Sequence, residues 1–465
     1  MIKTSGLIKH FLLVSLLIDI YLFNGCAQKT EENIVAKVAD RTITADEFAF
    51  AYEMAPRSIT SLTSKQARQA VLDQLIDRIV LARQAERLRL DDDTLLQRTV
   101  DFYKRLAVNR ELYLKHIRRL VEVSEQEERQ AFEYSKTKLY VRHFSTKQFD
   151  LARQVSLGIV QFEHTPIFTG APQVELTDYG IVDKISWRDI PQEVANILYN
   201  LPLRQYSDPF FDGQRYHVFQ VVEFEKEVLL RESDFQANRQ SLNGIIRQRK
   251  EQKLATEYVQ KIMTPQNVII KAEALNRLTE EVWRNRPTEV VTLEQYITNR
   301  EINTIGESSR DFLNKPIATF KSGEMTVADI LINYKVNPVK ISYKSKMTVR
   351  ESLKNAVGMY VRDWVLSEQG IKERLDRKPS VIAEERSRSE YLLMRKMLAY
   401  LGREFYAQNQ DTTGRQEKLE KYIANYEHNL RRAENIEIYS SNLMAVKTTD
   451  EGLARKIDFV VFHTQ

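Results

Sequence analysis

A chain of 465 residues is too long for one ordinary core, so we expect two to four domains. Hydrophobic residues make up 43% and charged residues 29%, with only 14 glycines, which excludes a disordered chain and favours a helix-rich globular one. The net charge of +5 arises from 69 basic and 64 acidic residues without a concentrated Lys/Arg stripe, so we expect no nucleic-acid partner.

Residues 1–25 have the pattern of a secretory signal peptide. Two lysines precede an apolar run from Phe11 to Leu22, which is too short to span a bilayer comfortably. The only cysteine, Cys26, follows this run and resembles the lipidated residue of a lipoprotein. We expect Cys26 to be lipidated and residues 26–33 to be a tether, with an uncleaved anchor or an incidental cysteine as the alternative.

Residues 34–136 are expected to form the N-terminal part of a helical lobe. Residues 34–38 and 42–44 fit a β-hairpin, and Thr44 is placed to cap a helix. Apolar residues at helical spacing then predict three further helices, which begin at Ser64, near Asp92 and after Ser124.

Residues 137–226 read as a compact mixed domain. A strand at 139–143 precedes a helix at 146–160, and a second helix follows Pro191. The domain closes on 216–222, where apolar and polar residues partly alternate as in a half-buried strand. The chain as a whole is therefore predicted to be α+β and mainly helical.

The rest of the chain returns to helical patterns. Residues 227–283, with a long helix and a short strand, are expected to complete the first lobe. Residues 284–316 lack a clear period and are interpreted as a connector. Residues 317–465 are predicted to be a second helical lobe.

This second lobe looks like a repeat of the first without the central domain. Residues 35–56 align with 317–338 without a gap, so that Ala36 meets Ala318 and Thr44 meets Thr326. In both copies long helices follow, and a helix end later runs into a strand. The identities are few, so chance similarity of two hairpin-plus-helix units is the alternative.

The central motifs resemble those of exported chaperones and prolyl isomerases typified by SurA, with PpiD and PrsA as relatives. These proteins carry a parvulin-type isomerase domain on a helical lobe. The similar elements, in chain order, are Arg142-His143, Thr177-Asp-Tyr-Gly180, Pro191, Ser207-Asp-Pro209 and Tyr216-His217. The resemblance covers about Ile34 to Leu275.

The resemblance implies candidate site residues. His143 and His217 would pair beneath a proline-binding site, with Ile190, Val194 and Tyr216 as binding residues. Two departures indicate a degenerate site: the segment between the first helix and Thr177 is short, and the expected pocket wall is small and charged. Two histidines that are simply satisfied in a small core remain an open alternative.

No metal or cofactor is expected. His116 and His164 lack metal-ligand spacing and are expected to be solvated. Asp91 to Asp93 stand at the start of a helix, where negative charge is stabilised by the helix dipole. We therefore expect them to cap the helix and not to bind a metal. The sequence has no phosphate-binding loop.

Three functions follow as expectations. The first is a SurA-like chaperone in the periplasm, tethered through lipidated Cys26 to a membrane, which we expect to be the outer one. Its partners would be unfolded or extended polypeptides such as outer-membrane barrel proteins. The second is an active parvulin-type peptidyl-prolyl cis-trans isomerase. The third is a structural envelope lipoprotein that binds one folded partner.

Overall fold

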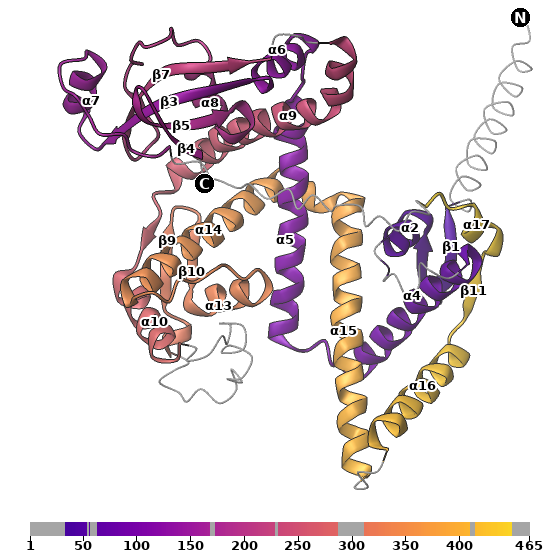
Figure 1. The fold of residues 1–465 in the computed structure, drawn as a ribbon. Coiled ribbons are helices and arrows are strands. Elements are labelled where there is room, and N and C mark those ends of the chain that lie inside the picture. Colours follow the sequence, from indigo (N-terminus) through magenta and orange to yellow (C-terminus); the bar gives the residue numbers. More distant parts are fainter. Residues whose placement is uncertain are drawn as a thin grey trace, which may run out of the picture. The chain divides into compact units, whose positions relative to one another are not determined.

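The computed structural model describes residues 33–53, 55, 63–167, 173–227, 231–286, 311–409 and 414–448. The chain divides into two compact units. Unit 1 is Met1–Leu112 with Met263–Val461, and unit 2 is Tyr113–Ile262 with Phe462–Gln465. Helices outnumber strands in the described residues, which confirms the mainly helical α+β class (Figure 1).

The expected signal peptide and Cys26 lie outside the described residues. Within the ranges given above, no helix has both the length and the apolar character needed to cross a bilayer.

Unit 1 contains two β-hairpins with the same register. β1 (Ile34–Val38) pairs with β2 (Arg41–Thr44), and β9 (Pro316–Phe320) pairs with β10 (Gly323–Thr326). In the first hairpin Ala36 lies opposite Ile43, and in the second Ala318 lies opposite Met325. These are the positions that the gap-free alignment matched, so the two hairpins share the register that the alignment predicts.

Each hairpin runs into three helices. The first copy has α2 (Ala45–Glu53), α4 (Ser64–Arg87) and α5 (Thr94–His116), and the second has α13 (Val327–Val336), α14 (Lys346–Lys372) and α15 (Pro379–Gln408). Thr44 Oγ1 accepts the N–H of Glu47 at 3.2 Å, and Thr326 Oγ1 accepts the N–H of Asp329 at 3.2 Å. A threonine stands at both positions because its hydroxyl satisfies an N–H group that the helix leaves unpaired.

The two copies exchange their closing strands. β11 (Ile436–Ile438), near the end of the second copy, pairs with β1, and Ile438 lies opposite Ala36. β8 (Ile269–Ile270), after the first copy, pairs with β9, and Ile270 lies opposite Ala318. Figure 1 shows the yellow β11 beside the indigo β1. Each hairpin is thus completed by the other copy, in the same register.

The third helices are exchanged in the same way. α15 packs along α4, and a shared core joins Leu393, Met397 and Leu401 to Leu81, Ala82 and Ala85. α5 is tied instead to α14, because Arg105 Nη1 lies 2.7 Å from Glu368 Oε1 and Asn109 Nδ2 donates to the Asp363 carbonyl at 2.8 Å.

This exchange corrects the expected composition of the lobes. The first lobe contains β1, β2, α2 and α4 with α15, α16 (Arg415–Ala433), β11 and α17 (Ser440–Ala445), whereas the second contains β8, α10 (Ala272–Arg284) and β9 to α14. The sequence pattern instead predicts 227–283 in the first lobe and 317–465 in the second. Because the two hairpins present equivalent edges, the sequence pattern does not distinguish which edge a closing strand joins.

Unit 2 is built on a five-stranded antiparallel sheet with the strand order β4-β5-β3-β7-β6. Its strands are β3 (Thr137–Thr146), β4 (Gln173–Thr177), β5 (Gly180–Ser186), β6 (Phe210–Phe211) and β7 (Tyr216–Lys226). Its helices are α6 (Glu125–Ser135), α7 (Phe149–Ser156), α8 (Gln192–Leu198) and most of α9 (Glu232–Met263).

Helices α6 and α9 share the main core of this sheet. The rings of Phe132 on α6 and Phe235 on α9 lie 5.6 Å apart, and both pack with Val194 of α8. From the sequence, both helices are expected in the helical lobe. Their apolar stripes instead cover the face of the sheet that carries Val141 and Phe219.

Arg249 fixes α9 to the segment that precedes α8. Its Nη2 donates to the carbonyls of Trp187 and Ile190 at 2.7 and 2.8 Å, and its guanidinium lies 4.1 Å from the centre of a Trp187 ring. One side chain therefore satisfies two carbonyl groups beside the core.

Candidate functional site

The two histidines singled out from the sequence meet in unit 2. His143 stands on the central strand β3, and His217 stands on the neighbouring β7. Nε2 of His143 lies 2.9 Å from Nδ1 of His217, and the two rings are stacked with 12° between their planes. They are 1% and 3% exposed, so both belong to the interior of the unit.

The hydrogen bonds assign the protons of His143. Its Nδ1 lies 2.7 Å from the carbonyl oxygen of Thr165, which can only accept, so Nδ1 carries a proton. Burial lowers the pKa of His143 to about 4, although the Thr165 hydrogen bond opposes this shift. The ring is therefore neutral at neutral pH, and its Nε2 accepts a hydrogen bond from Nδ1 of His217.

Asp212 completes the network on the other side. Its Oδ2 lies 3.0 Å from Nε2 of His217. Burial alone would raise the pKa of Asp212, but the N–H groups of Arg215 and Gln214, together with His217, hold it below its usual range. The His217 ring thus lies between the His143 ring, next to its Nδ1, and the Asp212 carboxylate, next to its Nε2.

A second buried pair lies next to His143. The N–H of His143 donates to Nδ1 of His164 at 3.2 Å, and Nε2 of His164 lies 3.3 Å from Oδ2 of Asp183. The same Oδ2 accepts the N–H of Ile167 at 2.6 Å. The side chain of His164 is 5% exposed and that of Asp183 is fully buried. The expectation that His164 is solvated is therefore wrong.

The remaining candidate residues differ in their surroundings. Ile190 and Val194 are 3% and 1% exposed and lie in the core with Trp187. A ligand would reach them only if neighbouring side chains moved, so their binding role stays a prediction. Tyr216 is half-buried at the end of β7, where its ring packs 4.7 Å from that of Phe211 and 5.3 Å from that of Phe149.

The sequence reasoning missed Asp183 and Asp212. Asp212 could have been found from the Asp212-Gly213 pair, a turn signal directly before the strand of His217. Gly213 has a φ of 98°, which favours glycine, and the N–H of Asp212 donates to the carbonyl of Arg215 at 3.1 Å. No comparable local signal precedes Asp183.

The arrangement can orient a polar network, but it does not offer a metal site. Among the described residues, no group of three or more His, Cys, Asp or Glu side chains is placed to hold a metal ion. The buried histidines are suited to fixing the shape and polarity of the sheet beneath a substrate, and they lack the exposure that a nucleophile needs.

Comparison with known protein families finds a similarity over part of the chain. Residues 3–98 match the model of the SurA-like N-terminal domain. No curated protein sequence matches the chain.

Solved structures give weaker similarities. A SurA-like chaperone from Campylobacter jejuni is 14% identical, with 51% of this chain and 100% of that chain covered and a TM-score of 0.25. The peptidylprolyl isomerase PrsA from Bacillus anthracis is 14% identical, with 40% and 96% covered and a TM-score of 0.21. The foldase PrsA from Streptococcus pneumoniae is 12% identical, with 47% and 90% covered and a TM-score of 0.20. The family match confirms the resemblance seen in the sequence, since residues 3–98 are similar to the SurA-like N-terminal domain.

Proposed function

We propose that this protein is an exported chaperone that binds unfolded polypeptides in an extended form. The SurA-like N-terminal domain supports the chaperone class. The structural observation that carries the proposal is an apolar patch on an edge strand of unit 2, formed by Val174, Leu176 and Ile181 and called here the β4–β5 patch.

The β4–β5 patch is apolar and open to solvent. Val174, Leu176 and Ile181 are 55%, 81% and 51% exposed. Leu176 lies directly opposite Ile181 across the two strands, and Val174 shares the face of Leu176 because it is two residues away on β4. Three exposed apolar side chains on one short pair of strands would promote aggregation, so such a patch indicates a binding surface.

The position of β4 in the sheet gives this patch a way to bind a chain. β4 is the last strand of the sheet, and no strand among the described residues pairs with its outer side. An added extended chain would pair its backbone with β4 and place alternate side chains beside the apolar patch. Such binding depends little on the client sequence, needs no ATP and is reversible.

The membrane tether and the clients are finer parts of the same proposal. Lipidation of Cys26 would hold the chaperone at the outer membrane on its periplasmic side. Outer-membrane barrel proteins are suitable clients, because their strands alternate apolar and polar residues as an added strand on β4 requires.

Light scattering tests the proposal. The full chain at a stoichiometric amount should suppress aggregation of an unfolded barrel protein diluted from urea. Leu176→Asp and Ile181→Asp should each weaken this suppression several-fold. Leu157→Asp is the matched control, since Leu157 is 64% exposed but follows α7, away from β4. No suppression by the unmodified chain would disprove the chaperone function, and equal loss in all three variants would disprove the role of the patch.

A second candidate function is peptidyl-prolyl isomerisation in unit 2. The 2.9 Å contact between His143 and His217 favours it, because the resemblance implies such a pair beneath the site. A protease-coupled assay with a proline peptide tests it. A rate equal to the uncatalysed one, unchanged in His143→Ala, would remove this candidate.

A further inference from the structure

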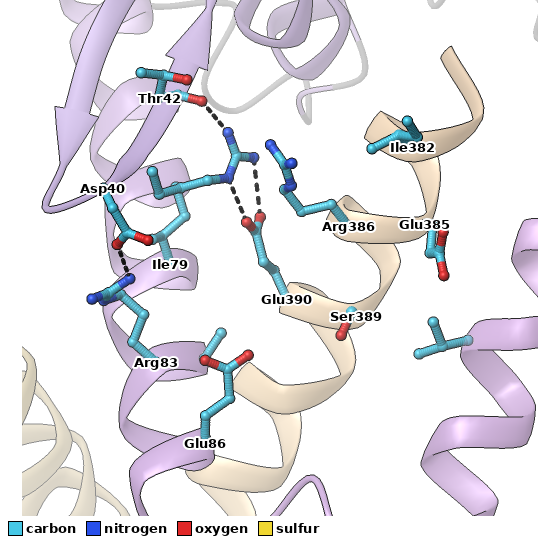
Figure 2. A pocket seen from close by; sticks show the side chains of 13 residues that line it. Asp40, Thr42, Ile79, Arg83, Glu86, Ile382, Glu385, Arg386, Ser389 and Glu390 are labelled. Carbon is cyan, nitrogen blue, oxygen red and sulfur yellow. Dashed lines mark hydrogen bonds and ion pairs between the residues drawn. The ribbon is translucent and has the colours of Figure 1, made fainter. Parts of the chain in front are cut away.

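A pocket of 640 Å³ opens in the first lobe of unit 1 (Figure 2). Its walls come from the turn between β1 and β2, from α4 and from α15, with Val100 of α5 at one side. Because α15 belongs to the second copy of the repeat, the pocket exists only through the exchange of helices between the copies. Its volume is in the range of sites that hold a small ligand or a short peptide.

Most charges around the pocket are already balanced. Arg41 and Arg78 both contact Glu47, at 2.7 and 3.1 Å, and both contact Glu390, at 2.6 and 3.3 Å. These four side chains are between 12% and 18% exposed, so they form a fixed and nearly buried neutral group.

Two further pairs balance other charges of the walls. Arg83 lies 2.6 Å from Asp40, and Glu385 lies 3.1 Å from Lys104. Each pair cancels one positive charge against one negative charge at the rim of the pocket.

Two lining charges are left over. Neither the guanidinium of Arg386 nor the carboxylate of Glu86 makes an ion pair or a side-chain hydrogen bond with any residue that the structure describes. In Figure 2 Arg386 extends from α15 towards the guanidinium that dashed lines join to Glu390, which is that of Arg41. Glu86 lies on the opposite wall, on α4.

Each of these two groups favours a ligand of opposite charge. The guanidinium of Arg41 is already balanced by Glu47 and Glu390, whereas that of Arg386 can still donate hydrogen bonds to a carboxylate in the pocket. On the other wall, burial and the neighbouring Asp91 raise the pKa of Glu86, and a cationic group in the pocket would stabilise its ionised form.

We propose that this pocket binds a short segment of an unfolded polypeptide, with an acidic side chain at Arg386 and a basic side chain at Glu86. The inference rests on the proposed function and adds a charge preference to it. Ile79 and Ile382 also line the pocket and offer apolar contact to a bound segment. The pocket would thus select segments by charge, whereas the β4–β5 patch binds them by shape and apolarity.

Calorimetric titration of the full chain with matched peptides tests this proposal. Three peptides share one apolar sequence and differ at two positions: one has Glu and Lys, one has Gln and Lys, and one has Lys at both. The first should bind about fivefold more tightly than the second and still more tightly than the third, an effect typical of a partly exposed ion pair. Raising the salt concentration should reduce this preference.

Variants of Arg386 show whether the preference arises in the pocket. Arg386 is exposed and unpaired, so its substitution should leave the fold intact. Arg386→Met should abolish the preference, Arg386→Lys should retain part of it, and Arg386→Glu should favour the peptide with two lysines. Arg395→Met is the control, since Arg395 is an exposed arginine of the same helix outside the pocket.

The outcomes separate the two proposals. Equal behaviour of Arg386→Met and Arg395→Met, or equal binding of all three peptides, would overturn the pocket assignment while aggregation suppression could still stand. If the chain neither binds any peptide nor suppresses aggregation, the chaperone function itself fails.

Discussion

Nε2 of His143 lies 2.9 Å from Nδ1 of His217, in the middle of a chain of contacts that runs from the Thr165 carbonyl to the Asp212 carboxylate. Removal of either ring would leave buried polar groups of its neighbours without a hydrogen-bond partner, because both rings are almost completely buried. The pair therefore contributes to the stability of unit 2 whether or not it also serves catalysis.

Replacement of His143 by alanine should destabilise unit 2. The change leaves a cavity beside Phe219 and removes the partners of the Thr165 carbonyl and of His217, so the free energy of unfolding should fall by about 2–4 kcal/mol. Urea unfolding followed by the fluorescence of buried Trp187, with the other two tryptophans replaced by phenylalanine, measures it. Lys147→Ala, an exposed change just after β3, is the control and should have little effect.

The same ring should make unit 2 sensitive to acid. The pKa of His143 is about 4 in the folded protein, against 6.5 for a free side chain. Between these two values the unfolded chain binds a proton that the folded chain does not, so stability should fall as the pH drops from about 6.5 to 4. Above pH 6.5 this loss of stability is absent. The whole pKa shift corresponds to a loss of about 3 kcal/mol in the free energy of unfolding.

Urea midpoints at pH 4.5, 5.5 and 7.5 check this dependence. His143→Gln should flatten the difference between pH 5.5 and 7.5, because glutamine does not titrate. The lowered pKa of Asp212 adds a loss of stability only at still lower pH, so it does not mask the effect. If the urea midpoint of His143→Gln still falls between pH 7.5 and 5.5 as much as that of the unmodified chain, another group is responsible for the acid sensitivity.

The local elements of the fold could be predicted from the sequence, but their partners could not. Thr44 and Thr326 were recognisable because capping depends on residues within one turn. The register of Ala36 and Ala318 was recognisable because the two copies share it. The exchange of β8 and β11 was not, since β11 joins a hairpin at the far end of the sequence and the two hairpins present equivalent edges to a closing strand.

The candidate site likewise has one part that could be predicted from the sequence and one part that could not. The pairing of His143 and His217 followed from the family resemblance, which supplies the fold around them. The burial of His164 beside Asp183 could not be predicted, because His164 lies in the 161–167 segment, which has no regular structure. Hydrogen bonds such as that from the Thr165 N–H to the His143 carbonyl, at 2.8 Å, hold this segment against β3. Periodicity carries no information about such a segment.

Arg249 provides a test of the assignment of α9 to unit 2. Arg249→Met keeps much of the side-chain volume but leaves the carbonyls of Trp187 and Ile190 without their donor. The loss should be about 2–3 kcal/mol, again read from Trp187 fluorescence. Lys253→Met, one turn further along α9 and exposed, should have almost no effect. Equal stability of both variants would contradict an anchoring role for Arg249.

Leu443 tests the exchange of closing segments in unit 1. It is 1% exposed on α17 and packs in the core formed by β1 and α4, more than 350 residues away in the sequence. Leu443→Ala should cost about 2–5 kcal/mol in the first lobe. Hydrogen exchange should therefore quicken at residues 34–44 and stay unchanged at residues 316–326. Met444→Ala is the matched control, since Met444 is 42% exposed. Faster exchange at 316–326 instead would mean that the C-terminal segment closes the hairpin of its own copy, and the pairing of β11 with β1 would be wrong.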